Sequence, residues 1–481
     1  MSYLILPILI LYGLASILLL IYGINCYLMI YYSSESRRKW GEAKTYNGQW
    51  PRVTVQLPIF NEKNVAARII QAACALDYPS DRLEIQVLDD SNDSTVDIVD
   101  RTTQRLRHRG IDVKVIRRPD RKGFKAGALA YGTQEAKGEF LAVFDADFVP
   151  DPEFLKKTIP ALLEDDRVAF VQARWGHLNR YDSLLTRCQA LGIDGHFLVE
   201  QPARAAANLF MNFNGTAGIW RKKAIDDVGG WSSATLTEDL DLSYRVQLAG
   251  WKPHYIVDVV APAELPDTIT AVKSQQFRWA KGSIQTALIM LPRVWRGPYS
   301  FLKKVEAFIH LTNYAVHPLM LTLALLAFPI LKFNLINLPP WVFIIAALPL
   351  VAATFGPSTM YTVATFRNTE IKKSSFLWLP LLVLYGTGIA VSNTIAVVEA
   401  IIGKSSSFIR TPKKGNLKLS GYKLNRSKLW ALEVMLGIYS IGSIMVSITS
   451  GNYGILPFLI LFASAFLTVG IRTAIGITQD A

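Results

Sequence analysis

Long runs of apolar residues lie toward both ends of the chain, and a stretch of mixed polarity separates them. Residues 4–30 contain no charged side chain. With a rise of about 1.5 Å per helical residue, a helix over this run exceeds the hydrocarbon core of a bilayer, which is about 30 Å thick. Further apolar runs cover residues 307–331, 341–366, 376–398 and 434–471. This pattern predicts a membrane protein with several spanning helices.

The stretch from about residue 45 to residue 292 has a different pattern, in which short apolar runs alternate with segments of helical periodicity. Residues 53–57, 83–88, 113–116 and 140–144 are short runs of the kind that form buried strands. Strands that alternate with helices predict a mostly parallel sheet, an α/β fold of the Rossmann-like kind. Ligands of such folds bind at the carboxyl ends of the strands.

Basic residues predict the orientation in the membrane. Arg37, Arg38 and Lys39 follow the first apolar run, and such residues mark the cytoplasmic side. If residues 376–398 crossed the membrane, the basic residues between 404 and 428 would lie outside, against the same rule. We therefore expect residues 374–403 to be re-entrant or interfacial. The predicted protein is a multi-pass protein of the plasma (inner) membrane, with its amino terminus outside and its polar domain in the cytoplasm.

These patterns divide the chain into segments. The predicted segments are a transmembrane helix at 1–32, a cytoplasmic α/β domain at 45–282, an interfacial amphipathic helix at 283–300, two transmembrane helices at 306–366, a re-entrant or interfacial segment at 374–403, a cytoplasmic loop at 404–428, and two transmembrane helices at 429–472. Apolar residues recur at helical spacing within 283–300, although a core helix of the polar domain would show the same pattern.

Composition and charge narrow the classes of function. The chain has 481 residues, of which 51% are hydrophobic, and a net charge of +13. The basic excess fits attraction to anionic lipid, and no nucleic-acid recognition motif accompanies it. We therefore expect the lipid bilayer, and not nucleic acid, as a partner. Cys26, Cys74 and Cys188 show no metal-ligand spacing and fit a reducing compartment without disulfides.

Acidic residues follow two of the predicted strands. Asp145 and Asp147 come after residues 140–144, where carboxylate oxygens suit Mg²⁺ or Mn²⁺ that bridges the oxygens of a diphosphate. Solvated acidic loops have the same D-x-D spacing, so the motif alone is a weak signal. Asp89 and Asp90 end residues 83–88 and can accept hydrogen bonds from a nucleotide base or ribose. Capping of the following helix by Asp90, Ser91 or Asp93 is the alternative.

Three further groups have the chemistry that is needed to transfer a group from a nucleotide diphosphate to a hydroxyl. Lys125 lies between glycines where a loop enters a helix, so its ammonium can approach a phosphate or base, although a plain surface turn has the same sequence. Asp239 is the candidate general base for an acceptor hydroxyl, and capping of a helix opened by Thr235 or Thr237 is the alternative. Arg278 can stabilise a departing diphosphate, and Trp279 can stack on a sugar ring.

Residues 51–295 resemble the inverting family 2 glycosyltransferases that have the GT-A fold and the D, D, D, QxxRW pattern, the group of cellulose, chitin and hyaluronan synthases. The closest resemblance is to the plant cellulose-synthase-like A and C proteins, which make mannan, glucomannan or xyloglucan-type backbones. The matching stretches are residues 56–62, 86–91, 124–129, 144–148, 171–175, 213–221, 238–242 and 275–279. The resemblance covers about half of the chain and implies a GT-A domain inserted into an α-helical transmembrane domain.

The resemblance also implies a role for each matching residue. It implies that Glu62, Lys125 and Asp89 or Asp90 contact the nucleotide, and that Asp145 and Asp147 bind the metal and the diphosphate. It implies that Asp239, beside Glu238, is the catalytic base. Gln275, Arg278 and Trp279 would bind the end of the product, and Asn214, Gly215 and Thr216 would bind the acceptor. Residues 408–413 resemble the FxVTxK gating loop of bacterial cellulose synthase, which implies nucleotide contacts by Phe408, Thr411 and Lys413. Arg410 departs from the valine of that motif.

The function that the resemblance implies is processive synthesis of a β-1,4-linked glucan, mannan or glucomannan from UDP-glucose or GDP-mannose. The growing glycan would pass through the membrane helices, with an export partner that the sequence does not identify. A glycolipid-forming β-glucosyltransferase, which acts on ceramide or diacylglycerol, is the alternative. A binding protein with a degenerate domain is a further alternative. Such a protein would have other residues in place of the catalytic carboxylates, Arg278 and Trp279, and all of these are present.

Overall fold

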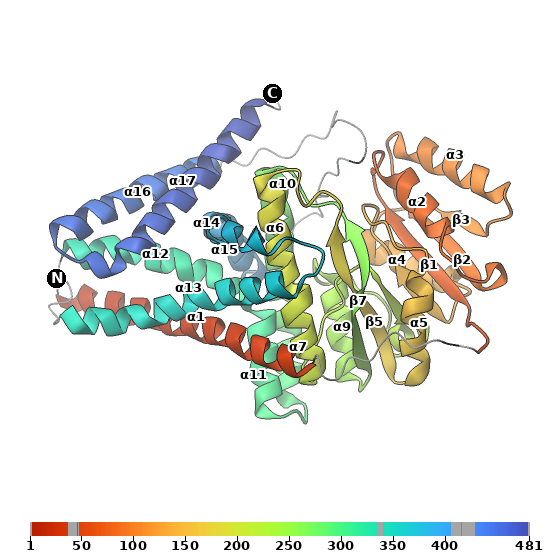
Figure 1. Cartoon of the computed structure of the whole chain (residues 1–481), viewed down its shortest axis with the longest axis horizontal. Helices are drawn as coiled ribbons and strands as arrows, with labels where there is room; N and C mark the ends of the chain where they lie inside the picture. Colours follow the sequence, from red (N-terminus) through yellow and green to blue (C-terminus); the bar gives the residue numbers. More distant parts are fainter. Residues whose placement is uncertain are drawn as a thin grey trace.

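The computed structural model describes residues 2–36, 46, 48–333, 340–405, 415 and 429–479. Figure 1 shows a sheet with its covering helices at one end of the molecule and a group of long helices at the other. Helix α10 (Ile269–Arg296) stands between these two parts. The protein therefore consists of an α/β domain that is joined through α10 to a helical domain.

A seven-stranded sheet forms the centre of the α/β domain in the described part of the chain, in the order β3-β2-β1-β4-β6-β5-β7. β6 runs antiparallel to both of its neighbours, and the other pairs are parallel. The strands are β1 (Val53–Ile59), β2 (Leu83–Asp89), β3 (Val113–Ile116), β4 (Phe140–Val143), β5 (Val168–His177), β6 (Gly218–Arg221) and β7 (Lys252–Ala263). The predicted α/β fold is confirmed, and β1 to β4 match the four predicted runs to within two residues at either end.

Alternating side chains of the strands build a hydrophobic core on each face of the sheet. In β4, Phe140 and Ala142 belong to one cluster, and Leu141 and Val143 belong to the other. The first face is covered by α2 (Ala66–Cys74), α3 (Thr95–Arg107) and α5 (Phe154–Glu164), and the second by α4 (Phe124–Glu135), α8 (Lys222–Asp226) and α9 (Glu238–Leu248). Burial on both faces explains why all four residues of β4 are apolar.

The remaining helices lead from the sheet to the helical domain. They are α6 (Leu184–Gly195), a π-turn at His196–Glu200, α7 (Gln201–Ala206), α11 (Phe301–Leu311), α12 (Val316–Lys332), α13 (Pro340–Arg367), α14 (Leu379–Gly388), α15 (Ala390–Ile401), α16 (Leu429–Thr449), α17 (Leu456–Gln479) and, from the start of the chain, α1 (Ser2–Ser36). Short 3₁₀ turns lie at Ser80–Arg82, Asn313–Ala315, Lys373–Trp378 and Tyr453–Ile455.

Within the described residues, four helices are long and apolar enough to cross a bilayer: Leu6–Glu35, Asn313–Lys332, Leu429–Thr449 and Tyr453–Gly476. The pair Lys373–Gly388 and Ala390–Ile401 passes the same test together, with a bend of 45°, and would make a fifth span. The bend lies inside the segment 374–403. A broken span and a re-entrant segment both fit such a bend, so the proposed topology of this segment stays a prediction.

The structure differs from the predicted segments around residue 282. α10 is one continuous helix from Ile269 to Arg296, so the amphipathic helix predicted at 283–300 is the second half of the helix that carries Gln275 and Trp279. Its exposed residues include Leu288 and Trp295, 54% and 44% accessible. α11 then begins at Phe301, ahead of the predicted start of the next segment at 306.

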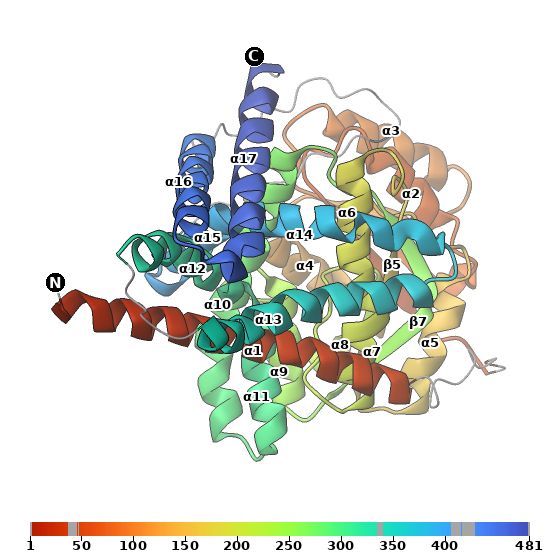
Figure 2. The ribbon, with the colours of Figure 1, turned by 60° about the vertical axis from the view of Figure 1, so that its left-hand side comes forward.

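Helices α1 and α13 lie side by side in both views (Figure 1 and Figure 2). Their backbones approach closely at Gly23, where an added Cβ would lie 2.6 Å from the Cα of Ala353. An added Cβ on Gly356 would lie 2.3 Å from the carbonyl oxygen of Gly23. Small residues at this crossing therefore let the two helices pack without a gap, as is common between helices in membranes.

Replacement of Gly23 by leucine should separate α1 from α13. We expect Gly23→Leu to destabilise the protein by about 1–3 kcal/mol, the usual cost of overpacking, measured as a lower unfolding midpoint in lipid nanodiscs. Gly13→Leu is the matched control in the same helix, because nothing lies within 4 Å of a Cβ added there. Equal midpoints for the two variants would contradict the close packing of α1 and α13.

Candidate active site

Two cavities meet at the boundary between the sheet and the helical domain. The first, the sheet-edge cavity, has a volume of about 160 Å³ and is lined by Phe60, Asp90 and Asp145, which follow β1, β2 and β4. The second, the helix-lined cavity, has a volume of about 640 Å³. Six residues line both: Trp175, Asn214, Thr237, Asp239, Gln275 and Trp279. The two cavities are therefore neighbours that share one wall.

Most of the candidate site residues converge on the sheet-edge cavity. Those that line it are Glu62, Asp90, Lys125, Asp145, Asp147, Asn214, Gly215, Glu238, Asp239, Gln275, Arg278 and Trp279. Asp89 and Thr216 do not line it. Phe408, Thr411 and Lys413 lie outside the described residues. Residues that are more than 200 positions apart in the sequence thus meet at the carboxyl ends of the strands, as the parallel arrangement requires.

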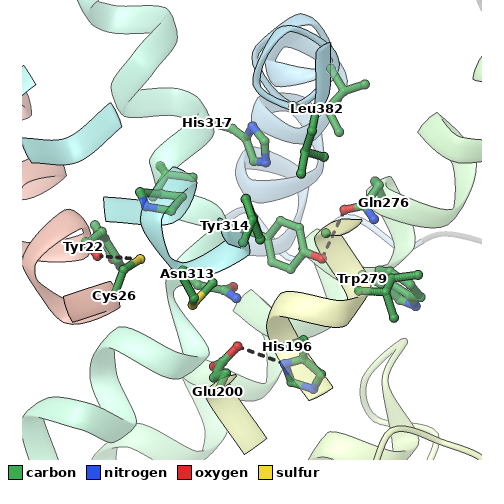
Figure 3. Close-up of a pocket in the computed structure, with 18 of the residues that line it drawn as sticks. Tyr22, Cys26, His196, Glu200, Gln276, Trp279, Asn313, Tyr314, His317 and Leu382 are labelled. Carbon is green, nitrogen blue, oxygen red and sulfur yellow. Dashed lines mark hydrogen bonds and ion pairs between the residues drawn. The ribbon is translucent and has the colours of Figure 1, made fainter. Parts of the chain in front are cut away.

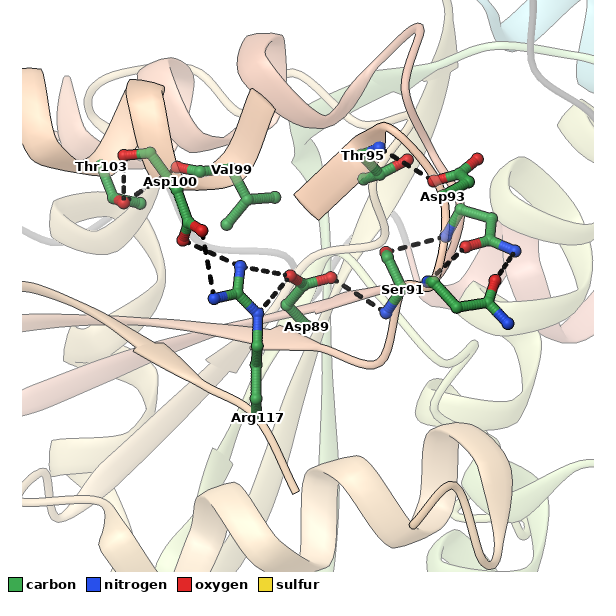
Figure 4. Close-up of polar contacts among 10 residues, drawn as sticks. Asp89, Ser91, Asp93, Thr95, Val99, Asp100, Thr103 and Arg117 are labelled. Atoms are coloured by element: carbon green, nitrogen blue, oxygen red, sulfur yellow. Dashed lines mark hydrogen bonds and ion pairs between the residues drawn. The ribbon is translucent and has the colours of Figure 1, made fainter. Parts of the chain in front are cut away.

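The two neighbouring aspartates after β2 make different contacts. The Asp89 carboxylate is fully buried and accepts hydrogen bonds from the Arg117 side chain and from the Ser91 backbone N–H, at 2.9 and 3.1 Å (Figure 4). Asp90 instead accepts two hydrogen bonds from the Arg118 guanidinium, at 2.8 and 2.5 Å. At the start of α3, it is Asp93 and not Asp90 that accepts a hydrogen bond from the Thr95 backbone N–H. Asp90 is therefore the one of the pair that lies at the cavity.

Arg118 links Asp90 to the start of α4. Its remaining hydrogen bonds go to the carbonyl oxygens of Lys122 and Phe124, at 2.6 and 2.7 Å. Gly123 begins α4 in the left-handed conformation, with φ of +73°. A bidentate guanidinium in this position fixes the loop and with it the direction of Lys125. Sequence analysis did not single out Arg118, because its partner lies 28 residues away in the chain.

Lys125 is the central cation of the site. Its ammonium lies 2.5 Å from Asp145 Oδ1, 2.9 Å from the carbonyl oxygen of Gly215, and 3.7 Å from Glu238 Oε1. Burial lowers the pKa of Lys125, but Asp145 and Glu238 outweigh this effect, so the pKa lies above its ordinary value. The Lys125 ammonium is therefore charged in this cavity, where it can attract a phosphate.

Asp145 and Asp147 offer oxygen ligands to a divalent cation. The backbone N–H of Asp145 donates to Thr216 Oγ1 at 2.9 Å, which fixes the turn after β4. Among the described residues, no group of three or more His, Cys, Asp or Glu side chains is arranged to hold a metal ion. Two carboxylates alone fit a site of the kind that Mg²⁺ shares with substrate phosphates, since Mg²⁺ usually takes one or two protein carboxylates there.

Glu264 also lines the sheet-edge cavity. Its carboxylate pairs with Arg68 at 2.6 Å and accepts a hydrogen bond from the Gly415 N–H at 3.0 Å. Arg68 also donates to the carbonyl oxygen of Asp147, at 3.3 Å. Sequence analysis missed Glu264 and Arg68, because neither belongs to a recognisable motif. Both help to hold the acidic turn in place.

Asn214 lines both cavities, and the neighbouring Gly215 lines the sheet-edge cavity. The Asn214 side chain accepts from Gln201 at 2.7 Å and lies 3.0 Å from His196 Nε2, and its backbone N–H donates to Gln172 Oε1. Gly215 has φ of +78°, and an added Cβ would lie 2.9 Å from Asp239 Oδ2. Only glycine suits this position, because a side chain would displace the carboxylate.

Asp239 lies in the first turn of α9, where the helix dipole favours a negative charge. Its Oδ1 accepts a hydrogen bond from the Leu240 N–H at 2.9 Å. Thr237 precedes the helix but makes no side-chain cap, so its side chain does not open α9 as a cap would. Shielding from bulk water, followed by the charge of Glu238, raises the pKa of Asp239 to about 7, although Lys125 opposes the rise. A pKa in this range suits a general base at neutral pH.

Gln275, Arg278 and Trp279 lie on one face of α10 and line the sheet-edge cavity. The same face carries Gly282, where an added Cβ would lie 2.5 Å from Thr237 Cγ2 and 2.9 Å from Thr237 N. α10 therefore packs directly against the segment that precedes Asp239. This contact brings Trp279 and Asp239 to the shared wall of the two cavities.

The helix-lined cavity extends from Trp279 between helices α1, α10, α12, α13, α14 and α17. Figure 3 shows polar and aromatic side chains that surround it: Tyr22, Cys26, His196, Glu200, Gln276, Trp279, Asn313, Tyr314 and His317. Tyr314 donates to Gln276 Oε1 at 3.3 Å, and His196 Nδ1 lies 2.9 Å from Glu200 Oε2. Hydroxyl, amide and aromatic groups are the usual partners of a sugar ring.

Trp175 is a further residue to which the sequence motifs assign no role. It lines both cavities, and its ring lies 5.2 Å from that of Phe197 and 5.4 Å from that of Phe148, between centroids. Its strand, β5, was not predicted. The signal was present in the matching stretch 171–175, but the position of Trp175 depends on the long pairing between β5 and β7.

Comparisons with known proteins agree with this geometry. Residues 51–282 match the family model described as glycosyltransferase-like family 2. The chain is 34% identical over 449 residues to glucomannan 4-β-mannosyltransferase 1 of Oryza sativa subsp. japonica, covering 88% of this chain and 82% of the relative. It is 44% identical over 264 residues to glucomannan 4-β-mannosyltransferase 2 of Arabidopsis thaliana, covering 54% and 49%.

Among solved structures, a mannosyltransferase from Pyrobaculum calidifontis in complex with GDP-Man and Mn²⁺ is similar in fold. The TM-score is 0.52 at 20% sequence identity, and the match covers 82% of this chain and all of that one. The fold, together with the relatives, defines the class of protein as a hexosyltransferase with a GT-A domain, and its apolar helices are consistent with membrane association. Within this class, the chain belongs to the family 2 glycosyltransferases, close to the cellulose-synthase-like A group.

The contact between Gly215 and Asp239 can be tested with an added methyl group. We expect Gly215→Ala to lower the transfer rate about a hundredfold, because Asp239 is the candidate base and misplacement of a group that takes part in a reaction by about 1 Å costs that much. Gly229→Ala is the matched control, since Gly229 also has a positive φ, +84°, and open space around it. Both variants carry the same backbone strain, so equal rates in a hexose-transfer assay would contradict the contact.

Proposed function

We propose that the protein transfers mannose from GDP-mannose to the non-reducing end of a β-1,4-linked mannan or glucomannan, and that the polymer leaves through the helix-lined cavity. The observation that carries this proposal is the junction of the two cavities at Asp239 and Trp279. The relatives named above as glucomannan 4-β-mannosyltransferases support mannose as the sugar and β-1,4 as the linkage. UDP-glucose is the competing donor, since a glucomannan contains both sugars.

The sheet-edge cavity would hold the nucleotide diphosphate. Asp90 lies where a base or ribose can be bound, and Lys125 and Arg278 supply positive charge for the phosphates. Asp145 and Asp147 would hold Mg²⁺ or Mn²⁺, which when bound neutralises charge on the diphosphate leaving group. The similar mannosyltransferase fold that was solved with GDP-Man and Mn²⁺ supports this choice of donor and metal.

Asp239 would act as the general base. It removes the proton from the acceptor hydroxyl as the hydroxyl oxygen bonds to C1 of the donor sugar. The bond between C1 and the diphosphate oxygen breaks on the opposite side, so the configuration at C1 is inverted. Arg278 stabilises the negative charge that collects on the departing diphosphate. Trp279 provides a flat apolar surface for the acceptor sugar, and Asn214 lies at the same wall.

The helix-lined cavity would hold the product chain. Its wall carries polar groups within helices that are otherwise apolar, including Tyr22, Asn313 and His317. Polar residues inside membrane helices usually face a water-filled or substrate-filled cavity. The helix-lined cavity has a volume of about 640 Å³, which is larger than that of the sheet-edge cavity. A cavity of this size suits several sugar units.

We also propose that the α/β domain lies in the cytoplasm and that residues 374–403 are re-entrant. Arg367 at the end of α13 donates to Ser33 Oγ at 2.7 Å, so the ends of α1 and α13 lie together beside the catalytic domain. Glu370, just before the bent segment, pairs with Arg174 of β5, and Glu399, near the end of the segment, pairs with Lys281 of α10 at 2.9 Å. Both flanks of the segment therefore contact the α/β domain or the helix that begins beside it. This supports a segment that enters and leaves on one side, as the positive-inside rule predicts.

The donor and product can be tested with the purified protein in lipid nanodiscs. With Mn²⁺ or Mg²⁺, we expect radiolabel from GDP-mannose to enter a high-molecular-weight product that β-1,4-mannanase digests, and removal of the metal with EDTA to abolish incorporation. UDP-glucose is offered alone and together with GDP-mannose. A product that is extractable into organic solvent and carries one sugar would replace the proposal with glycolipid synthesis.

The base can be tested by pH. Because Asp239 must be ionised to accept a proton and its pKa is about 7, kcat/KM should rise about tenfold per unit from pH 5 to pH 7 and level off above. Asp239→Asn should lower the rate by at least about a hundredfold at all pH values. Asp226→Asn serves as a control outside both cavities. A rate that is constant between pH 5 and pH 8 would contradict the assignment.

A further inference from the structure

Helix α10 carries two kinds of residue on opposite faces. At about 100° of rotation per residue, Gln275, Arg278 and Trp279 share one face, whereas Lys273 and Lys281 lie about 80° apart on the other. Neither lysine lines either cavity. Both are nonetheless buried, with 6% and 0% of their surface exposed. A buried lysine that does not contact substrate needs another explanation, because burial of a charge is costly.

Each lysine forms an ion pair with a different membrane-side helix. Lys273 Nζ lies 2.5 Å from Glu433 Oε1 in α16, and the Glu433 side chain is fully buried. Lys281 Nζ lies 2.9 Å from Glu399 Oε2 in α15. The other oxygen of Glu399 accepts a hydrogen bond from Lys404 Nζ at 2.6 Å. Helix α10, which carries Trp279, is thus tied by charge to α15, which packs against it, and to α16.

The opposite face of α10 is fixed as well. Gly282 packs against Thr237, which immediately precedes the acidic residues of α9, with no room for a side chain. Apolar contacts add to the packing on the other side, where Ile284 lies in one cluster with Val397 and Ala400 of α15. Apolar contacts permit a helix to slide, whereas an ion pair is satisfied at one register only. A shift of α10 by one turn, about 5.4 Å, would break both ion pairs.

We infer that Lys273 and Lys281 are positioning residues, which set the register of α10 against α16 and α15 and thereby hold Trp279 at the wall shared by the two cavities. Glu433 and Glu399 are their counterparts. This inference rests on the proposed roles of Gln275, Arg278 and Trp279. The two carboxylates stand on either side of residues 404–428 in the sequence, so one helix is tied to both flanks of a single connection.

Replacement of a whole ion pair separates positioning from stability. Breaking a buried pair by removing one partner is destabilising, whereas replacing both partners by apolar residues of similar size is often neutral or stabilising. We therefore expect Lys273→Met/Glu433→Met and Lys281→Met/Glu399→Met to unfold within a few degrees of the wild type. The kcat for polymer synthesis should fall about tenfold to a hundredfold, because the reacting groups are misplaced. The KM for the nucleotide sugar should change by less than about twofold, since the sheet-edge cavity keeps its nucleotide-binding groups.

Two comparisons make the outcome decisive. Lys157→Met/Glu153→Met removes an exposed ion pair, 2.8 Å long, in the α/β domain and should change neither kcat nor the unfolding midpoint. Trp279→Ala tests the underlying proposal: if it retains polymer synthesis, the assignment of the catalytic face fails independently. If Trp279→Ala is inactive but both double methionine variants keep the wild-type kcat, the positioning inference is overturned. Loss of folding in both double variants would also overturn it, because the ion pairs would then serve stability.

Discussion

Crowding of carboxylates at one edge of the sheet is the constraint on which the site depends. Asp145, Glu238 and Asp239 come from two distant parts of the chain and face one cavity, where their mutual repulsion would separate them without a counter-charge. Lys125 supplies that charge from the start of α4, within 2.5 Å of Asp145 and 3.7 Å of Glu238. The position of Lys125 depends in turn on Arg118, which joins the loop before α4 to Asp90. Ion pairs, together with the hydrogen bonds of Arg118 to the loop before α4, thus link Asp90 to the candidate site residues around Lys125.

Sequence patterns predicted the first half of the sheet well and the second half poorly. β1 to β4 alternate with helices, and β1, β2 and β4 are almost fully buried, so the four strands form short, mostly apolar runs that are visible in the chain. β5 and β7 carry Arg174, His177 and Asp258 among their apolar residues, and their pairing contains register shifts, so no simple period marks them. β6 is four residues long and follows a loop. Its antiparallel direction depends on contacts that are made only in three dimensions.

The candidate site motifs were visible because their acidic residues follow strand ends or lie at a helix start, and because Gln275, Arg278 and Trp279 recur at helical spacing. Asp145, Asp239 and Trp279 meet in the structure at the places that the order of motifs predicted. The partners of these residues could not be predicted in the same way. Arg118 and Glu264 belong to no motif, and the buried lysines of α10 look in the sequence like ordinary surface charges. Their roles depend on which helix packs against them, and local patterns contain no such information.

The continuity of α10 has a consequence for the architecture of the whole protein. No flexible linker separates the catalytic domain from the helical domain at this point, because one helix begins beside the sheet at Ile269 and ends at Arg296. A cut at its middle would expose Gly282 and Lys281 and remove half of the packing on either side. The two domains therefore share a structural element and cannot be exchanged as independent modules. Insertions at this junction would be tolerated only outside α10, so the length of this single helix sets the spacing between the sheet and the start of α11.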